Sequence, residues 1–312
     1  MDLTNVFNMT LQLLKKYTSN FFISNTKKYH FNPHHYKNRE VALLTQHGKE
    51  KVLAPILYES IGCMVTRVDN YDTDILGTFT RDIPRLNTQV DTVRKKALIG
   101  MKHSSLSLGL ASEGSFGPDP FTGMFSRNVE ILIWVDNDSN LEIIAMAQGR
   151  TNLDHLLTSS WSEVEVFAKK IGFPEHYLIV RPESENDKRI IKNISTWDEL
   201  QRAFNLALEQ STNKQLFIET DMRAHANPTR MNNIEVAAQE LVKKLSSLCP
   251  NCNAPGYWIV EHISGLPCRA CNIPTHEIRA EVHACSKCKH QVIIERKDQE
   301  YANPSHCEYC NP

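Results

Sequence analysis

The stretch Val41-Ala-Leu-Leu-Thr45 is followed by His47-Gly48 and then by Lys-Glu-Lys-Val-Leu-Ala-Pro-Ile-Leu-Tyr-Glu-Ser-Ile over residues 49–61. A short, continuously apolar run is typical of a buried strand. The segment after the glycine places Val52, Ile56, Leu57 and Ile61 on one side at helical spacing, so it predicts an amphipathic helix. Pro55 is tolerated only near the first turn, which leaves the start of this helix open. A strand, a turn and a helix in this order begin an α/β pattern.

The alternation of strand and helix continues to residue 246. Further strands are expected at 63–68, 106–111, 129–135, 141–147, 177–180, 190–194 and 216–219. A helix is expected at 87–101, and others begin at the capping boxes Ser160-Trp-Ser-Glu163 and Thr196-Trp-Asp-Glu199 and at Asn227-Pro228. The sequence therefore predicts an α/β fold with a mixed sheet flanked by helices, followed by a small cysteine-rich module.

Eight of the nine cysteines form four Cys-x-x-Cys pairs: Cys249 and Cys252, Cys268 and Cys271, Cys285 and Cys288, and Cys307 and Cys310. Such a turn directs two thiolates at one tetrahedral ion, and two turns complete a Cys₄ zinc site. Disulfides would need an oxidising compartment, which no export signal indicates, and a redox motif would need one pair rather than four. The pairs therefore predict two zinc ions in a double zinc ribbon.

All eight ligands are cysteine, so neither ion keeps an open position and both are expected to be structural. Pairing the first turn with the second and the third with the fourth is the simplest connectivity, and an interleaved arrangement is the alternative. The predicted organisation is an N-terminal extension over residues 1–39, an α/β domain over 40–246 and the zinc ribbons over 247–312. Zinc should supply much of the stability of the last segment, because so short a chain buries little core.

The composition gives no general indication of binding to nucleic acid or to a membrane. The chain has 312 residues, 23% of them charged, with a net charge of −1, so nothing global favours nucleic acid or a membrane surface. No run approaches the roughly 20 apolar residues of a membrane span, and the start lacks the features of a signal peptide, so a cytoplasmic protein is expected. Basic residues of the tail, such as Lys287 and Arg296, are offset by acids such as Glu295. This favours a solvated surface over a nucleic-acid patch, although the ribbons leave nucleic-acid binding open.

Polar residues follow the first two predicted strands. His47, Gly48 and Lys49 form a glycine turn before a helix, where backbone N–H groups and a lysine suit phosphate. The Walker spacing is absent, and an ordinary strand-to-helix turn explains these residues equally well. Asp74, close to Asp72 and followed by Arg81, could hold magnesium and phosphate, or belong to a polar hairpin.

Two further polar segments lie where strands are expected to end, the place where ligands collect in α/β sheets. Ser112-Glu113-Gly114-Ser115-Phe-Gly-Pro-Asp119 is predicted to be a loop, with Glu113 placed as a metal ligand or base, or simply as a solvated acid in a tight turn. The segment Arg223-Ala-His225-Ala-Asn-Pro-Thr-Arg230 follows a strand and begins a helix, which suits an anion.

These segments also carry two resemblances. Together with the cysteine-rich tail, they resemble the hallmarks of an uncharacterised, mostly bacterial domain-of-unknown-function family, a match that covers residue 40 to the end and implies no activity. More loosely, the order of parts is similar to the inosine triphosphate pyrophosphatase-like superfamily, which cleaves non-canonical nucleoside triphosphates. That likeness implies that Lys49 holds phosphate, that Glu113 binds magnesium or acts as base, and that His225 or Arg230 touches the nucleotide.

The leading hypothesis is a magnesium-dependent hydrolase of a nucleotide or related phosphorylated metabolite. Its catalytic residues would be Glu113, Lys49 and Asp74, and its ligand-binding residues would be His47, Arg81, Ser112, Ser115, Asp119, Arg223, His225 and Arg230. The alternative is a non-catalytic module in which the same loops recognise a nucleotide or RNA end and the ribbons dock a partner. A purely structural role in an assembly is a third reading, which leaves Glu113 unexplained.

Overall fold

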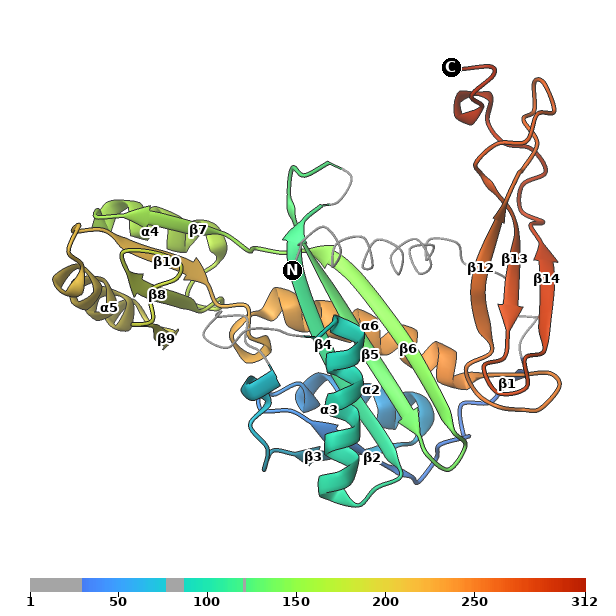
Figure 1. Cartoon of the computed structure of the whole chain (residues 1–312), viewed down its shortest axis with the longest axis horizontal. Helices are drawn as coiled ribbons and strands as arrows, with labels where there is room; N and C mark the ends of the chain where they lie inside the picture. Colours follow the sequence, from blue (N-terminus) through green and yellow to red (C-terminus); the bar gives the residue numbers. More distant parts are fainter. Residues whose placement is uncertain (1–29, 77–86, 120–121) are drawn as a thin grey trace.

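The structure, a computed structural model, describes residues 30–76, 87–119 and 122–312 and contains three sheets of three or more strands (Figure 1). The largest is a mixed sheet in the order β3-β2-β4-β5-β6, formed by β2 (Glu40–Leu44), β3 (Met64–Val68), β4 (Leu108–Pro118), β5 (Ser126–Asp136) and β6 (Leu141–Arg150). Strand β2 runs parallel to β3 and β4, and the remaining pairs are antiparallel.

Helices cover both faces of this sheet. Helices α2 (Glu50–Ile61) and α6 (Pro228–Ser246) pack with Leu108 and Leu110 of β4 on one face. Helix α3 (Gln89–Ser104) packs with Ala111 on the other. Successive residues of a strand point to opposite faces, so the alternation of β4 fixes both layers. The predicted α/β fold with a mixed sheet flanked by helices is therefore confirmed.

The connections of β2 and β4 create a switch point in the sheet. Helix α2 leads from β2 to its neighbour β3 on one face, and α3 leads from β3 to β4 on the other face. The carboxyl end of β2, which lies beside Leu110 in the first part of β4, is therefore where the chain changes direction across the sheet, the usual place for a ligand in such folds.

Strand β4 is longer than the sequence indicated. The predicted loop after residue 111 is wrong, because Ser112 to Pro118 continue the strand and pair residue by residue with β5. The backbone groups of this glycine-containing stretch find partners along an equally long neighbour, which outweighs its low strand propensity. Glu113 is therefore a strand residue rather than a loop residue.

Residues 151–222 form an insertion between β6 and α6. Its antiparallel sheet, in the order β7-β10-β8-β9, consists of β7 (His155–Thr158), β8 (Leu178–Pro182), β9 (Ile191–Ile194) and β10 (Leu216–Thr220). Helices α4 (Trp161–Ile171) and α5 (Trp197–Gln210) cover one face and enclose a separate hydrophobic core. The range 40–246, expected as one α/β unit, thus contains two sheets with separate cores.

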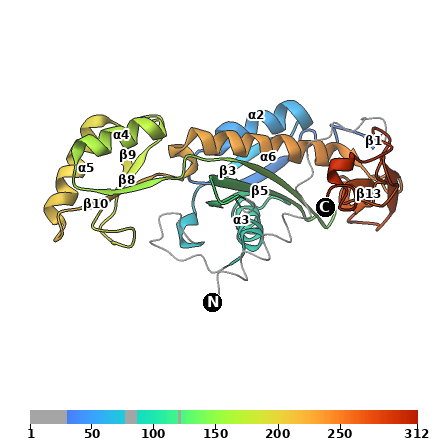
Figure 2. The same cartoon turned by 90° about the horizontal axis from the view of Figure 1, so that it is seen from above.

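The cysteine-rich tail contains a third, antiparallel sheet of β12 (Trp258–Ser264), β13 (Ile278–Ala284) and β14 (Gln291–Glu295). At its base β1 (His30–Phe31) pairs with β11 (Ser247–Leu248). Figure 2 shows α6 running along the body from the inserted unit to this tail. Short 3₁₀ turns complete the fold: η2 (Thr73–Leu76), η3 (Ala224–Ala226) and η4 (Pro304–His306). Among the described helices, none has the length and apolar character needed to cross a membrane.

Candidate functional site

Lys49 lies at the carboxyl end of β2, where it becomes part of a buried polar network. Its Nζ donates to the backbone oxygen of Ser112 at 2.8 Å and to Ser112 Oγ at 3.2 Å. The side chain is only 7% exposed. Burial, reinforced by the nearby guanidinium of Arg230, lowers the pKa of Lys49 to about 7, against the opposing influence of Glu130.

The network continues to α6 through Glu130, a fully buried residue of β5. Ser112 Oγ donates to Glu130 Oε2 at 3.2 Å, and Arg230 Nε donates to Glu130 Oε1 at 2.6 Å. Arg230, 2% exposed, also donates to the backbone oxygen of Met222 at 2.7 Å. Gly114 lies against this ion pair, since a Cβ there would stand 2.3 Å from Glu130 Oε1. Lys49, Ser112, Glu130 and Arg230 therefore form one connected unit on the α2/α6 face.

Glu113 belongs to the opposite, α3 face of the sheet. Lys96 Nζ lies 2.6 Å from Glu113 Oε2, and both side chains are largely buried. Gln89, the first residue of α3, donates to the backbone oxygen of Glu113 at 2.7 Å and accepts from Ser115 Oγ at 3.1 Å. Glu113 and Lys49 thus lie on opposite faces of the sheet, both close to the carboxyl end of β2.

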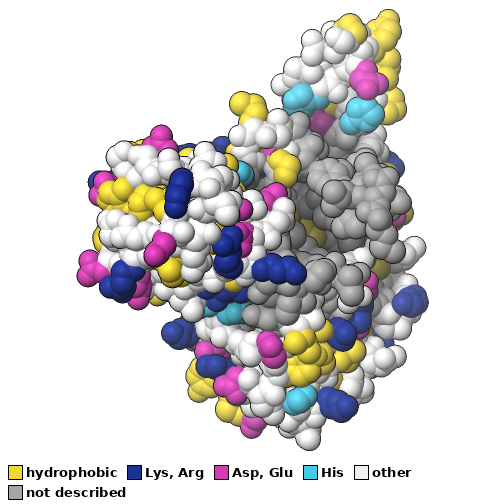
Figure 3. Space-filling model, turned by 60° about the vertical axis from the view of Figure 1, so that its left-hand side comes forward, with side chains coloured by type: hydrophobic (Ala, Val, Ile, Leu, Met, Phe, Trp, Pro, Cys, Tyr) yellow, Lys and Arg dark blue, Asp and Glu magenta, His cyan; other side chains and the backbone are white. Residues whose placement is uncertain are grey.

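Two histidines lie beside Lys49, at the carboxyl end of β2. The ring of His47, from the β2–α2 turn, stacks on the ring of His225 in η3 with 5.1 Å between centroids. Burial, followed by the charge of Lys49, lowers the pKa of His47 to about 3, so this imidazole is neutral at pH 7. Arg223 is held by a buried carboxylate, with its Nε 3.0 Å from Asp221 Oδ1, and its NH2 donates to Asn193 of β9 at 2.7 Å. Figure 3 shows Lys and Arg side chains gathered where the inserted unit meets the main body.

The structure therefore unites most of the predicted site residues and separates others. Eight of them lie around the carboxyl end of β2, where it runs beside β4: His47, Lys49, Ser112, Glu113, Ser115, Arg223, His225 and Arg230.

Asp119 lies elsewhere, six residues beyond Glu113 and so about 20 Å along the strand direction. There it pairs with Arg127 at 3.1 Å and accepts from Thr122. Asp119 is bound in the β4–β5 turn rather than aimed at the edge. Asp74 lies in η2, but its side chain is outside the described part of the chain, as is all of Arg81.

Glu130, Lys96 and Gln89 were not among the predicted site residues. Glu130 carries a signal in the sequence, because it is a single charge within the otherwise apolar run of residues 129–135. A buried charge without a partner is costly, so its position implies a buried cation nearby. Gln89 lies among polar helix residues and offers no comparable signal.

The eight cysteines of the tail form two clusters, each able to hold a metal ion: Cys249, Cys252, Cys285 and Cys288, and Cys268, Cys271, Cys307 and Cys310. Neighbouring Sγ atoms lie 3.6 Å apart for Cys249 and Cys288 and 3.9 Å apart for Cys268 and Cys310. Four thiolates at about 2.3 Å from one tetrahedral ion would lie about 3.8 Å from each other. The spacing therefore fits tetrahedral coordination.

The connectivity is interleaved, so the simplest pairing expected from the sequence is wrong. The first Cys-x-x-Cys turn joins the third, and the second joins the fourth. The antiparallel course of the three strands explains this result, because β12 leads away from the first turn and β13 leads back to it. Figure 1 shows the chain returning in this way before it ends at the far tip of the tail.

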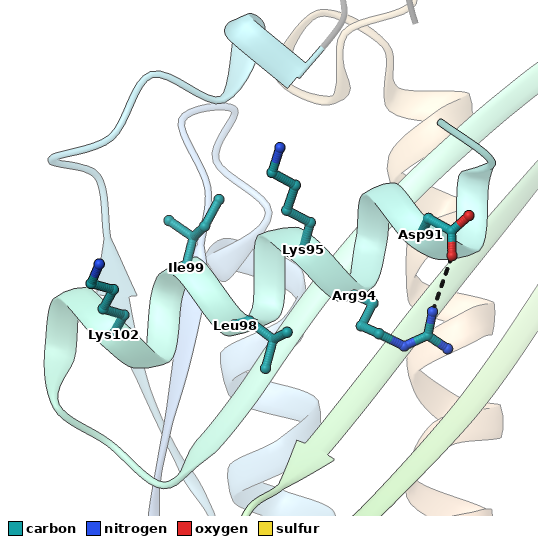
Figure 4. A pocket seen from close by; sticks show the side chains of 6 residues that line it. All are labelled: Asp91, Arg94, Lys95, Leu98, Ile99 and Lys102. Atoms are coloured by element: carbon teal, nitrogen blue, oxygen red, sulfur yellow. Dashed lines mark hydrogen bonds and ion pairs between the residues drawn. The ribbon is translucent and has the colours of Figure 1, made fainter. Parts of the chain in front are cut away.

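A shallow pocket of about 310 Å³ lies on α3 (Figure 4). Its lining consists of Asp91, Arg94, Lys95, Leu98, Ile99 and Lys102. Arg94 turns to Asp91, with 3.3 Å between NH1 and Oδ1. The pocket contains none of the predicted site residues and no cluster of catalytic side chains.

A family model with the description Domain of unknown function (DUF6671) matches residues 96–312. The match includes Glu113, Glu130, Arg230 and all eight tail cysteines, whereas the Lys49 turn precedes it. No curated protein and no solved structure matches the chain.

Proposed function

We propose that this chain, which belongs to the DUF6671 family, is a metal-dependent hydrolase of a nucleotide or a related phosphorylated metabolite. One observation carries the proposal: α2, α3 and α6 begin around the switch point between β2 and β4, and they bring the cations Lys49, Lys96 and Arg230. Helix N-termini and buried cations at such an edge suit an anionic ligand.

Each group has a role in this proposal. Lys49 and the N–H groups at the start of α2 would receive phosphate oxygens, and Arg230 would add positive potential from beneath. Lys96 pairs with Glu113 and orients its carboxylate. In this proposal the Glu113 carboxylate would ligate Mg²⁺ together with oxygens of the phosphate. The ion would neutralise charge on the phosphate and activate a water molecule.

A non-catalytic nucleotide-binding module is the second candidate. It is favoured by the fact that Glu113 and Glu130 each have a cation at 2.6 Å, so both carboxylates are already neutralised. A site of this kind could attract an anion and hold it without supplying a base.

Release of phosphate and pyrophosphate from standard and deaminated nucleoside triphosphates, with Mg²⁺ or Mn²⁺, separates the two candidates. We expect turnover in the wild type and its loss in Glu113→Gln, with ligand binding retained. Lys49→Ala should lose binding as well. Lys169→Ala, at an exposed lysine of α4, and Glu142→Gln, at an exposed glutamate of β6, serve as matched controls and should keep full activity.

The result decides among the readings. Binding of a non-hydrolysable nucleotide without turnover in the wild type would favour the binding module. Absence of both binding and turnover for every nucleotide would refute the nucleotide proposal.

Zinc is the metal that we propose for the two cysteine clusters. Four thiolates without an oxygen or nitrogen donor suit this ion, and an all-cysteine ligand set leaves no open position, which supports a structural role for both ions. The same turn recurs at three of the four ligand pairs: Asn253, Asn272 and Lys289, each directly after a pair, have φ of 57°, 61° and 61°. Such a turn aims backbone N–H groups at the sulfurs, as from Asn251 to Cys249 at 3.4 Å.

A further inference from the structure

Glu130 is at the centre of the buried network and is itself fully buried. One carboxylate oxygen accepts from Ser112, and the other accepts from Arg230 and, at 3.4 Å, from Asn128 Nδ2. It therefore connects Ser112 of β4 with Arg230 of α6, which lies 100 positions after Glu130 in the chain. Because Ser112 Oγ also accepts from Lys49, a single carboxylate links both cations.

The surroundings of Glu130 are built around this carboxylate. Asn128 is itself fixed by Asn233 Nδ2, which donates to its Oδ1 at 2.8 Å. Gly149 of β6 leaves room for Asn233, since a Cβ at Gly149 would stand 2.2 Å from Asn233 Oδ1. Two glycines, Gly114 and Gly149, thus make space for the polar side chains on either side. An arrangement of this kind restricts each side chain to one position.

We infer that Glu130 is a positioning residue that holds Lys49 and Arg230 in place beside the carboxyl end of β2, through its hydrogen bonds with Ser112 and Arg230. The inference rests on the proposed function, because such positioning matters to the activity only if the ligand is an anion. Glu130 would act through Ser112 and Arg230 and would not touch the substrate.

The charge on Lys49 depends on groups from every element around it. Those that act on it are Arg230 of α6, Lys96 of α3, Glu130 of β5 and Glu113 of β4, with His47 adjacent in the turn. Arg230 and Lys96 oppose protonation of Lys49, whereas Glu130 and Glu113 favour it. Removal of the Glu130 charge should therefore leave Lys49 neutral over more of the physiological pH range.

The test uses Glu130→Gln, which keeps the shape of the side chain and removes its charge. Titration of Lys49 in the full-length protein without ligand, followed by NMR of labelled lysine, should shift to lower pH by about one unit or more. Inorganic pyrophosphate should bind about fivefold more weakly at pH 7, because a pKa that falls from about 7 to about 6 lowers the protonated fraction of Lys49 from about one half to about one tenth. Glu142→Gln should leave both measurements unchanged.

Ser112→Ala is the second variant, since loss of the Glu130 charge can prevent folding. It removes the hydroxyl link while leaving the backbone oxygen that accepts from Lys49, so a smaller shift in the same direction is expected. A merely structural role would lower the melting temperature in both variants without moving the Lys49 titration, and that result would overturn the inference. A shifted titration in a protein that binds neither pyrophosphate nor nucleotides would uphold the role of Glu130 and refute the proposed function.

Discussion

Lys49 combines burial with a pKa of about 7, well below the usual 10.5, and this couples its titration to folding. Between these two values the unfolded chain binds a proton that the folded protein does not, so stability should rise with pH in this window by up to about 1.4 kcal/mol per pH unit. Urea unfolding at pH 7, 8 and 9 should show this rise in the wild type and in Lys51→Met. Lys49→Met should show a smaller rise, because burial also lowers the pKa of Lys244 to about 8 and that group contributes in the same direction. Equal slopes in all three proteins would contradict the buried titration of Lys49.

Gly114 is constrained by its neighbours rather than by its backbone conformation. A methyl group there would meet the Glu130 carboxylate at 2.3 Å and the Arg230 guanidinium at 2.7 Å. Gly114→Ala should therefore destabilise the protein by about 1–3 kcal/mol, the usual cost of overpacking a core. Gly117→Ala on the same strand is the control, because nothing lies within 4 Å of its added carbon. A similar denaturation midpoint for the two variants would argue against the close approach.

At the residue scale, the residues of the candidate site that lie next to helix starts could be predicted from the sequence, whereas the buried Glu130 could not. His47, Lys49, Arg223, His225 and Arg230 follow strands or precede helices, and local order alone brings such residues to a sheet edge. Glu130 is different, since its importance arises from contact with Arg230, 100 residues later. Only a three-dimensional neighbour can reveal which cation neutralises a charge within an apolar strand.

Two helices of the inserted unit offer a direct comparison of element ends. Both begin with a predicted capping box, but only Thr196 forms one, accepting from Glu199 N at 3.3 Å while Glu199 Oε2 accepts from Thr196 N at 3.1 Å. Ser160 makes no cap with its side chain, and the acid of its motif, Glu163, binds Thr158 instead.

The two caps should therefore differ in energy. Thr196→Ala should lower the free energy of unfolding by about 1 kcal/mol, since it removes a side-chain acceptor from the first turn of α5. Ser160→Ala should change it by only a few tenths of a kcal/mol. Calorimetry of the two variants would measure the difference, and equal losses would show that the sequence motif alone determines the cap energy.

Elements with strong local patterns were predictable, and those that depend on partners were not. The helix beginning at Asn227-Pro228 is correct, because its cap acts within one turn: Asn227 Oδ1 accepts from Arg230 N at 3.0 Å. The strand from Ser112 to Pro118 is held by β5, and its polar, glycine-containing sequence reads as a loop in isolation. The strands β12, β13 and β14 were likewise missed, since the cysteine spacing alone does not specify the strands between the turns.

At the scale of the whole molecule, the interleaved clusters predict which pairs of substitutions act together. Cys249→Ser with Cys285→Ser removes two ligands from one cluster, so one metal ion per chain should be lost. Cys249→Ser with Cys268→Ser damages both clusters, and both ions should be lost. Metal content by mass spectrometry of purified variants would measure this, and sequential pairing would give the reverse outcome.

The inserted unit has a hydrophobic core of its own, which the sequence does not mark. Its chain enters and leaves side by side, since Thr220 N donates to the backbone oxygen of Asp154 at 3.1 Å and Thr220 Oγ1 to that of Asn152 at 2.8 Å. No glycine- or serine-rich linker marks these points, so the strand and helix pattern runs on without interruption. Separate cores become visible only when the residues that pack together are known.

The interleaved connectivity also has a consequence for biosynthesis. On a growing chain, Cys268 and Cys271 leave the ribosome before Cys285 and Cys288, so the first complete set of four thiolates joins the first two turns. In the folded tail these turns lie at opposite ends of β12, whose seven residues span about 23 Å. We therefore expect a peptide of residues 247–277 to capture one zinc ion in a titration. A nascent chain that binds zinc in this way would have to exchange ligands to reach the interleaved arrangement of the folded tail.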